Sequence, residues 1–68
     1  MNDSMSRAMT EREVALQLGL SVATLRAWRL RQKGPRFVRF GRSVRYLEDD
    51  IRRFIETSRA WRKHEQSI

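Results

Sequence analysis

The sequence contains no cysteine, only one proline and three glycines, and a single histidine, His64, among its 68 residues. The lack of cysteine excludes disulfide bonds and cysteine-based metal sites. One histidine cannot form a histidine metal site alone, and we expect no metal and no other cofactor. The core must therefore depend on aliphatic and aromatic packing in one small domain, which at this length is only marginally stable.

Long apolar runs are also missing. No segment approaches the roughly 20 residues that cross a bilayer, and the polar start, MNDSMSRAM, lacks the apolar segment of a signal peptide. We therefore expect a cytoplasmic protein with no membrane partner. A nucleophile–base arrangement, a metal-ligand cluster and a glycine-rich phosphate loop are all missing as well, so we do not expect an enzyme.

Acidic residues are missing from one long segment. The whole chain carries 15 Lys and Arg against 8 Asp and Glu, a net charge of +7, yet no acid lies between Ser21 and Leu47. The basic residues of that segment are Arg26, Arg29, Arg31, Lys33, Arg36, Arg39, Arg42 and Arg45. A surface selected only for solubility mixes both signs, whereas a phosphate-facing surface is cationic. We therefore expect a polyanionic partner and one convex cationic face.

Local signals predict a helix-turn-helix. Thr10 and Glu13 have the spacing of a capping box that begins a helix, and Gly19 is suited to end it. Ser21 is a good N-cap for a second helix over residues 22–31. Two helices joined by a short Gly-x-Ser turn form the helix-turn-helix pattern.

The second half of the chain predicts a hairpin and a third helix. Two short β-like runs, residues 37–40 and 44–46, flank a turn at residues 41–43. Apolar residues and arginines alternate in both runs, so we expect one apolar and one basic face. Three acids at residues 48–50 complement the dipole of a third helix and supply its cap.

Together these elements predict a small α+β domain with the winged helix-turn-helix fold, in which three helices carry a two-stranded β-hairpin wing. We expect the domain to span residues 9–63, between a disordered N-terminal segment of residues 1–8 and a frayed tail of residues 64–68. Trp61 is either the edge of the core or a contact between monomers. The expected core consists of Val14, Leu18, Leu25, Trp28, Phe40, Tyr46, Ile51, Phe54 and Ile55.

The second helix carries the first group of candidate DNA-binding residues. With Leu25 facing inward, small and polar side chains lie on the opposite side and suit a DNA major groove. Arg26 can form a bidentate pair with guanine, whereas Arg29 lies on the inner flank and is better placed for a phosphate. A solvated helix with scattered arginines would show the same pattern. The candidates on this helix are Ser21, Ala23, Thr24, Arg26, Ala27, Arg29 and Arg31.

The hairpin carries the second group. Arg42 occupies the tip, from which an arginine can lie along the backbone or enter a minor groove. A solvated strand face is the alternative. However, the charges of a cationic hairpin and a cationic helix repel each other when the two lie side by side, and bound phosphates would relieve that repulsion. The candidates on the wing are Arg39, Arg42, Ser43 and Arg45.

The combined motifs resemble the excisionase/AlpA group of small winged-helix proteins, which are related to the DNA-binding domain of MerR regulators. The matching runs are Thr10–Ala15, Leu18–Ser21, Thr24–Arg29 and Gly34–Tyr46. The resemblance covers about Met9 to Ile55 and implies that the second helix enters the major groove while the wing reaches the adjacent minor groove. It points to Thr24, Arg26 and Arg29 on the helix and to Arg42 and Arg45 on the wing.

The resemblance also implies a function. Such proteins act as recombination directionality factors, or excisionases, of a phage or integrative element. Several copies bind adjacent DNA repeats cooperatively on the bacterial nucleoid and bend the DNA, which directs an integrase toward excision. The expected partners are thus double-stranded DNA, further copies of the chain and an integrase.

Other functions remain open at this point. The nearest is an AlpA-like transcriptional regulator with the same fold, and another is the DNA-binding module of a phage packaging subunit. A basic RNA-binding or protein-interaction module belongs to a different class. Preference for a specific duplex over single strands and heparin would separate the DNA-binding functions from that class.

Overall fold

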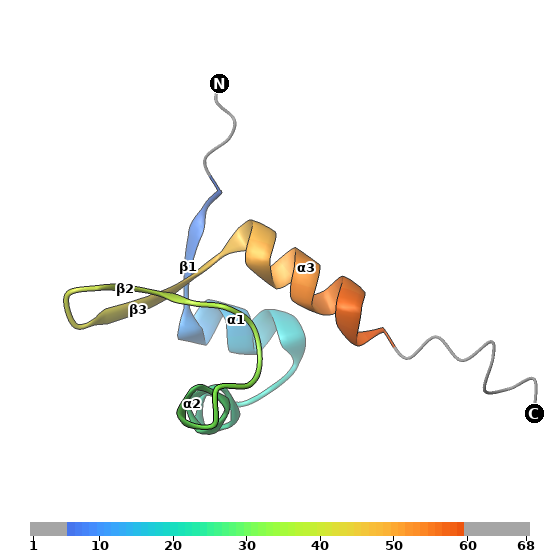
Figure 1. Ribbon diagram of the computed structural model, residues 1–68, viewed down its shortest axis with the longest axis horizontal. Helices are drawn as coiled ribbons and strands as arrows, with labels where there is room; N and C mark the ends of the chain where they lie inside the picture. The colour runs from blue at the N-terminus through green and yellow to red at the C-terminus, as the bar shows by residue number, and fades with distance from the viewer. Residues whose placement is uncertain (1–5, 60–68) are drawn as a thin grey trace, which may run out of the picture.

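The computed structural model describes residues 6–59. Three helices and three short strands follow each other along the chain (Figure 1). The strands form one antiparallel sheet in the order β1-β3-β2. This is the predicted winged helix-turn-helix fold, with one strand more than expected. In chain order the elements are β1 (Ala8–Thr10), α1 (Glu11–Leu18), α2 (Val22–Leu30), β2 (Val38–Phe40), β3 (Ser43–Leu47) and α3 (Glu48–Ser58).

Some expectations concern residues outside the described part of the chain. These are the disorder of residues 1–5, the domain boundary at residue 63, the role of Trp61 and the frayed tail. Within residues 6–59, none of the helices combines the length and the apolar character that a membrane span needs.

The predicted caps begin α1 and form the turn between α1 and α2. The Thr10 Oγ1 accepts a hydrogen bond from the Glu13 backbone N–H at 3.1 Å, and the Glu13 Oε1 accepts one from the Thr10 N–H at 2.9 Å. α1 ends at Gly19, whose φ of 70° lies in the left-handed region. The Ser21 Oγ then accepts from the Thr24 N–H at 3.1 Å and begins α2. Local sequence therefore determines where α1 begins and how it turns into α2.

β1 is the strand that the sequence analysis missed. Its residues pair with the central strand β3, with Ala8 opposite Leu47 and Thr10 opposite Arg45. The expectation of disorder up to residue 8 is therefore wrong for residues 6–8. The physical reason is that pairing with β3 satisfies the backbone of this segment, and the pairing joins residues far apart in the sequence.

The same segment caps α3. The Arg7 carbonyl accepts from the Glu48 N–H at 2.8 Å, and the Ser6 Oγ accepts from the Asp49 N–H, also at 2.8 Å. The N-cap residue itself is Leu47, which makes no side-chain capping bond. The expectation that the acids of residues 48–50 supply the cap is therefore wrong. They lie in the first helical turn instead, where they complement the helix dipole.

The hairpin has a two-residue turn rather than the expected three-residue turn. Phe40 pairs with Ser43, which leaves only Gly41 and Arg42 in the turn. Gly41 has a φ of 63°, and a left-handed residue at the first turn position is typical of a type II′ hairpin turn. The shorter turn shifts the register of the two strands by one residue.

This register mixes apolar and basic residues on both faces of the hairpin. Val38 lies opposite Arg45, and Arg39 lies opposite Val44. Since paired residues share a face and a shift of one residue exchanges the faces, the expected separation into an apolar and a basic face is wrong.

The core lies where α1, α2 and α3 meet the sheet. Leu18 and Trp28 are partly buried and pack against it, and the half-buried Phe54 ring lies 5.8 Å from that of Trp28. The buried apolar residues are Met9, Val14, Ala15, Leu25, Tyr46 and Ile51.

Two residues of the predicted core are exposed. Phe40 is 59% exposed because the hairpin register places it opposite the small Ser43 and beside solvent. Ile55 is 37% exposed, and it belongs to the second half of α3, which extends away from the sheet (Figure 1). The core predictions for these two residues are therefore wrong.

Candidate nucleic-acid interface

An open hollow of about 540 Å³ lies between the start of α1, α2 and the β2–β3 hairpin. We call it the basic hollow. Its lining consists of Thr10, Glu11, Arg12, Arg26, Arg29, Arg39, Arg42, Val44 and Arg45. Six arginines from four elements and one turn therefore surround a single carboxylate.

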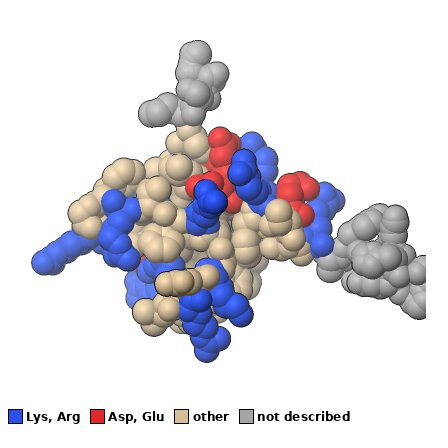
Figure 2. Space-filling model, in the orientation of Figure 1, with Lys and Arg blue, Asp and Glu red and all other residues tan. Residues whose placement is uncertain are grey.

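The basic hollow contains only part of the cationic segment. Its lining does not include Arg31, Lys33 or Arg36. A second hollow, beside the loop after α2, is lined by Lys33 and Arg36. The expectation of one convex cationic face is therefore wrong. The hairpin projects past the helices (Figure 1), and the surface between it and α2 is hollowed. In Figure 2, red acidic atoms gather over α3, whereas the hairpin and α2 are blue and tan.

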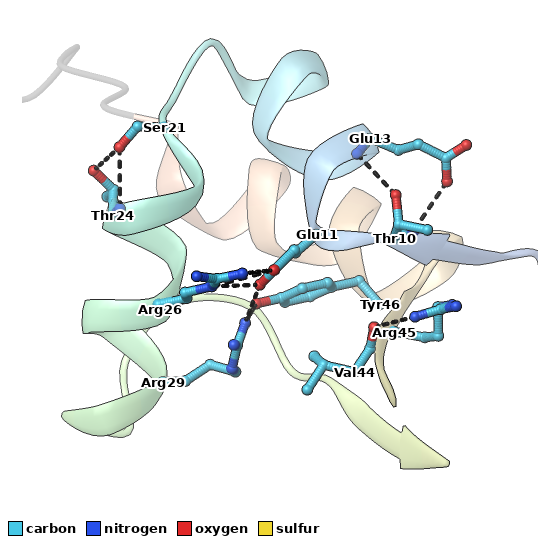
Figure 3. Close-up of polar contacts among 10 residues, drawn as sticks. All are labelled: Thr10, Glu11, Glu13, Ser21, Thr24, Arg26, Arg29, Val44, Arg45 and Tyr46. Carbon is cyan, nitrogen blue, oxygen red and sulfur yellow. Dashed lines mark hydrogen bonds and ion pairs between the residues drawn. The ribbon is translucent and has the colours of Figure 1, made fainter. Parts of the chain in front are cut away.

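Arg26 forms an ion pair with Glu11 across the helix-turn-helix. Its Nη2 donates to Glu11 Oε2 at 2.6 Å, and its Nε lies 3.2 and 3.3 Å from the two carboxylate oxygens (Figure 3). These hydrogen bonds hold the pKa of Glu11 below its usual 4.5, although burial opposes the shift. The same hydrogen bonds raise the pKa of Arg26. Both side chains therefore stay charged at neutral pH.

Arg29 joins α2 to both α1 and β3. Its Nη1 donates to the Tyr46 hydroxyl at 2.8 Å and to Glu11 Oε1 at 3.2 Å (Figure 3). Its guanidinium carbon lies 5.6 Å from the centre of the Phe37 ring, and its side chain is only 16% exposed. Arg29 thus lies on the inner flank of α2, where it holds the helix against the sheet.

The remaining candidates on α2 lie outside the lining of the basic hollow. The Ser21 and Thr24 hydroxyls are 3.0 Å apart and hydrogen-bond to each other at the start of the helix. Ala23 and Ala27 are exposed, and Arg31 is the exposed C-cap residue. The outer surface of α2 therefore carries small side chains that allow close approach.

On the wing, Arg39 and Arg42 are exposed. Arg39 also lies over the Phe37 ring, at 5.7 Å from its centre. Arg45 is half-buried and its Nη1 donates to the Val44 carbonyl at 2.8 Å. Ser43 is exposed but does not line the basic hollow. The hairpin thus offers two solvent-facing guanidinium groups and one that is partly engaged.

Sequence reasoning missed Thr10, Glu11 and Arg12 as residues of this site. Thr10 was assigned to capping, which it performs as well. Glu11 looks like any acid in a first helical turn, where it complements the dipole, and its partner Arg26 is 15 positions away. No local signal distinguishes these residues from ordinary helix-start residues.

Comparison with known proteins agrees with this geometry. A family model described as a helix-turn-helix domain matches residues 8–59, from β1 to the end of α3. The chain matches no curated protein and no solved structure. The matched family is one of DNA-binding domains and not of enzymes, and a helix-turn-helix binds double-stranded DNA through its second helix. The protein therefore belongs to the helix-turn-helix domain family and is a DNA-binding protein.

Proposed function

We propose that the protein is an excisionase, or recombination directionality factor, of a phage or integrative element. The observation that carries the binding of duplex DNA in this proposal is the basic hollow between α2 and the wing. In duplex DNA a ridge of phosphates separates the major groove from the minor groove. A helix in one groove and a hairpin in the next would place that ridge in the hollow, where the arginines neutralise it.

Each element then has a separate role. Ala23 and Ala27 let α2 approach base edges and contact thymine methyl groups, and Arg26 reads guanine. Arg42 at the wing tip contacts the phosphate backbone at the adjacent minor groove, where negative potential is concentrated. Arg29 lies on the inner flank of α2 and fixes the helix in place. Its proposed contact with DNA is to a phosphate.

The excision role rests on the resemblance of the chain to excisionases in motifs and charge. A DNA-binding domain can redirect recombination by shaping DNA for another enzyme. We propose that several copies bind adjacent repeats of an attachment site on the bacterial nucleoid and bend it. An integrase partner then performs the cleavage and joining.

Footprinting on the DNA that flanks the gene tests this function. With increasing protein we expect protection to spread stepwise across repeats inside an attachment site, and we expect integrase-dependent excision to require the protein. Protection confined to a promoter would replace the proposal with transcriptional regulation. Equal affinity for the duplex, single strands and heparin would contradict sequence-specific binding altogether.

A further inference from the structure

We infer that Glu11 is a specificity-determining residue, which holds Arg26 in the orientation that reads guanine and lowers the attraction of the site for DNA of any sequence. The inference rests on the proposed reading of duplex DNA by α2. It concerns a carboxylate at the first position of α1, outside both groups of residues that the sequence marks for DNA binding.

The hydrogen bonds leave one edge of Arg26 available. A guanidinium group carries five N–H donors in a rigid fork. Glu11 occupies the Nε side of this fork and one N–H of Nη2. Within residues 6–59, Nη1 of Arg26 makes no hydrogen bond, and the side chain is 63% exposed. The outer edge therefore offers two parallel N–H groups, which is the arrangement that pairs with O6 and N7 of guanine.

Glu11 is itself held in place from the core. Its Oε1 accepts from Arg29 at 3.2 Å, and Arg29 also donates to the hydroxyl of Tyr46, which is fully buried. The Glu11 side chain is only 21% exposed. A series of contacts thus runs from the sheet through Arg29 and Glu11 to Arg26. An arginine held in this way loses less conformational freedom when it binds a base, which favours the correct contact.

The charge of Glu11 also increases the specificity of DNA binding. It is the one acid among the residues that line the basic hollow. A negative charge at this position repels phosphates whatever the base sequence, so it weakens non-specific binding. Specificity is a difference between two affinities. Glu11 increases that difference by supporting the guanine contact and by opposing binding that lacks it.

The test begins with a duplex library that has a randomised centre. The wild-type protein selects its preferred duplex, and the loss of preference in R26A identifies the G·C pair that Arg26 reads. E11A and E11Q are then titrated with this duplex and with the version in which that pair is changed. E56A is the matched control because Glu56 of α3 pairs with Arg59, the residue that follows the helix, outside the lining of the hollow.

We expect the ratio of affinities for the preferred and the changed duplex to fall about tenfold in E11A. Its affinity for unrelated duplex should rise, and the salt dependence of that binding should become steeper. E11Q keeps an acceptor oxygen but no charge, so it should retain part of the discrimination and still bind unrelated duplex more tightly. E56A should behave as wild type in discrimination. Thermal melting of each variant establishes that it is folded.

Two outcomes separate the inference from the proposed function. Wild-type discrimination in folded E11A would overturn the role of Glu11 and leave sequence-specific binding intact. A wild-type protein that selects no preferred duplex would overturn the proposed function itself. A purely structural role for Glu11 predicts equal weakening on both duplexes, and that result would also overturn the inference.

Discussion

Tyr46 and Phe40 belong to the same hairpin but have opposite surroundings. Tyr46 is 1% exposed and pairs with Met9 of β1, and its ring centre lies 6.3 Å from that of Phe37. Phe40 lies opposite Ser43 and is largely in solvent. Because the free energy of burial follows the apolar area removed from water, only Tyr46 contributes substantially to stability.

Substitution of the two aromatic residues should therefore give unequal results. Tyr46→Ala leaves a cavity and removes the partner of Arg29, so it should lower the free energy of unfolding by about 3–5 kcal/mol. Phe40→Ala should change it by no more than about 0.5 kcal/mol. Urea unfolding of both variants measures the difference. A large loss in Phe40→Ala would show that its ring is packed and that the hairpin register is different.

At the scale of the element, α3 depends on residues that precede it by about 40 positions in the chain. The hydroxyl of Ser6 accepts from the Asp49 N–H, which is one of the backbone donors that a helix start leaves without a partner. The cap of α3 is thus tertiary, whereas those of α1 and α2 are local.

Removal of this cap should destabilise the domain measurably. We expect Ser6→Ala to lower the free energy of unfolding by about 1 kcal/mol, the usual effect of losing an N-cap oxygen. Ser43→Ala is the control, since the Ser43 side chain makes no hydrogen bond within residues 6–59. Chemical denaturation compares the two variants. Equal stabilities would mean that water replaces the Ser6 contact without loss.

The contrast between local and tertiary contacts explains what the sequence could predict. Thr10, Gly19 and Ser21 act on backbone groups within a few residues, and these caps were predicted correctly. The pairing of β1 with β3 joins residues about 40 positions apart, and the hairpin register depends on whether Ser43 belongs to the turn or the strand. Amphipathic alternation favoured the wrong choice there, because it assumes that the apolar side chains of both strands share a face.

The residues of the candidate site also divide into those that the sequence could predict and those that depend on tertiary contacts. The five arginines that line the basic hollow from α2 and the wing were predicted, because charge segregation is visible in the sequence. The pairing of Glu11 with Arg26 was not predicted, because it depends on how closely α1 and α2 approach each other in the fold. The family match extends the prediction to DNA binding, while the individual contacts with DNA stay predictions.

At the scale of the whole molecule, acid should weaken the fold through two carboxylates. Hydrogen bonds from Arg26 lower the pKa of Glu11, and a bond from the Thr10 backbone lowers that of Glu13. A carboxyl group whose pKa is lower in the folded state stabilises the fold above its unfolded pKa, near 4.5. That contribution disappears as the pH falls through the lower folded value.

We therefore expect the free energy of unfolding to decrease as the pH is lowered below about 4.5. The double variant Glu11→Gln/Glu13→Gln should show a shallower decrease, because it lacks both groups. Denaturant unfolding between neutral pH and pH 3 measures the slopes, with Glu56→Gln as the control. An unchanged slope in the double variant would assign acid sensitivity to other groups.

The distribution of charge over the whole molecule makes a prediction for DNA binding. Arg42→Ala should weaken binding to all duplexes alike and reduce the salt slope by about one, because Arg42 is proposed to contact the backbone at a minor groove. Arg52→Ala removes the same charge from α3, where Arg52 pairs with Asp49, and should have little effect. Titrations at several salt concentrations measure both. Equal slopes for the two variants would show that the attraction is not confined to the basic hollow.

The hydrogen bond between Arg29 and Tyr46 has a mechanical consequence. It joins the helix proposed to read DNA to β3, the central strand of the sheet and one of the two strands of the wing, so it opposes changes in the spacing of the two contact points. Any mismatch with the groove spacing of relaxed B-form DNA must then be absorbed by the duplex, at a cost that depends on how easily its base steps deform. A rigid protein of this kind can favour flexible sequences at base pairs that it never touches.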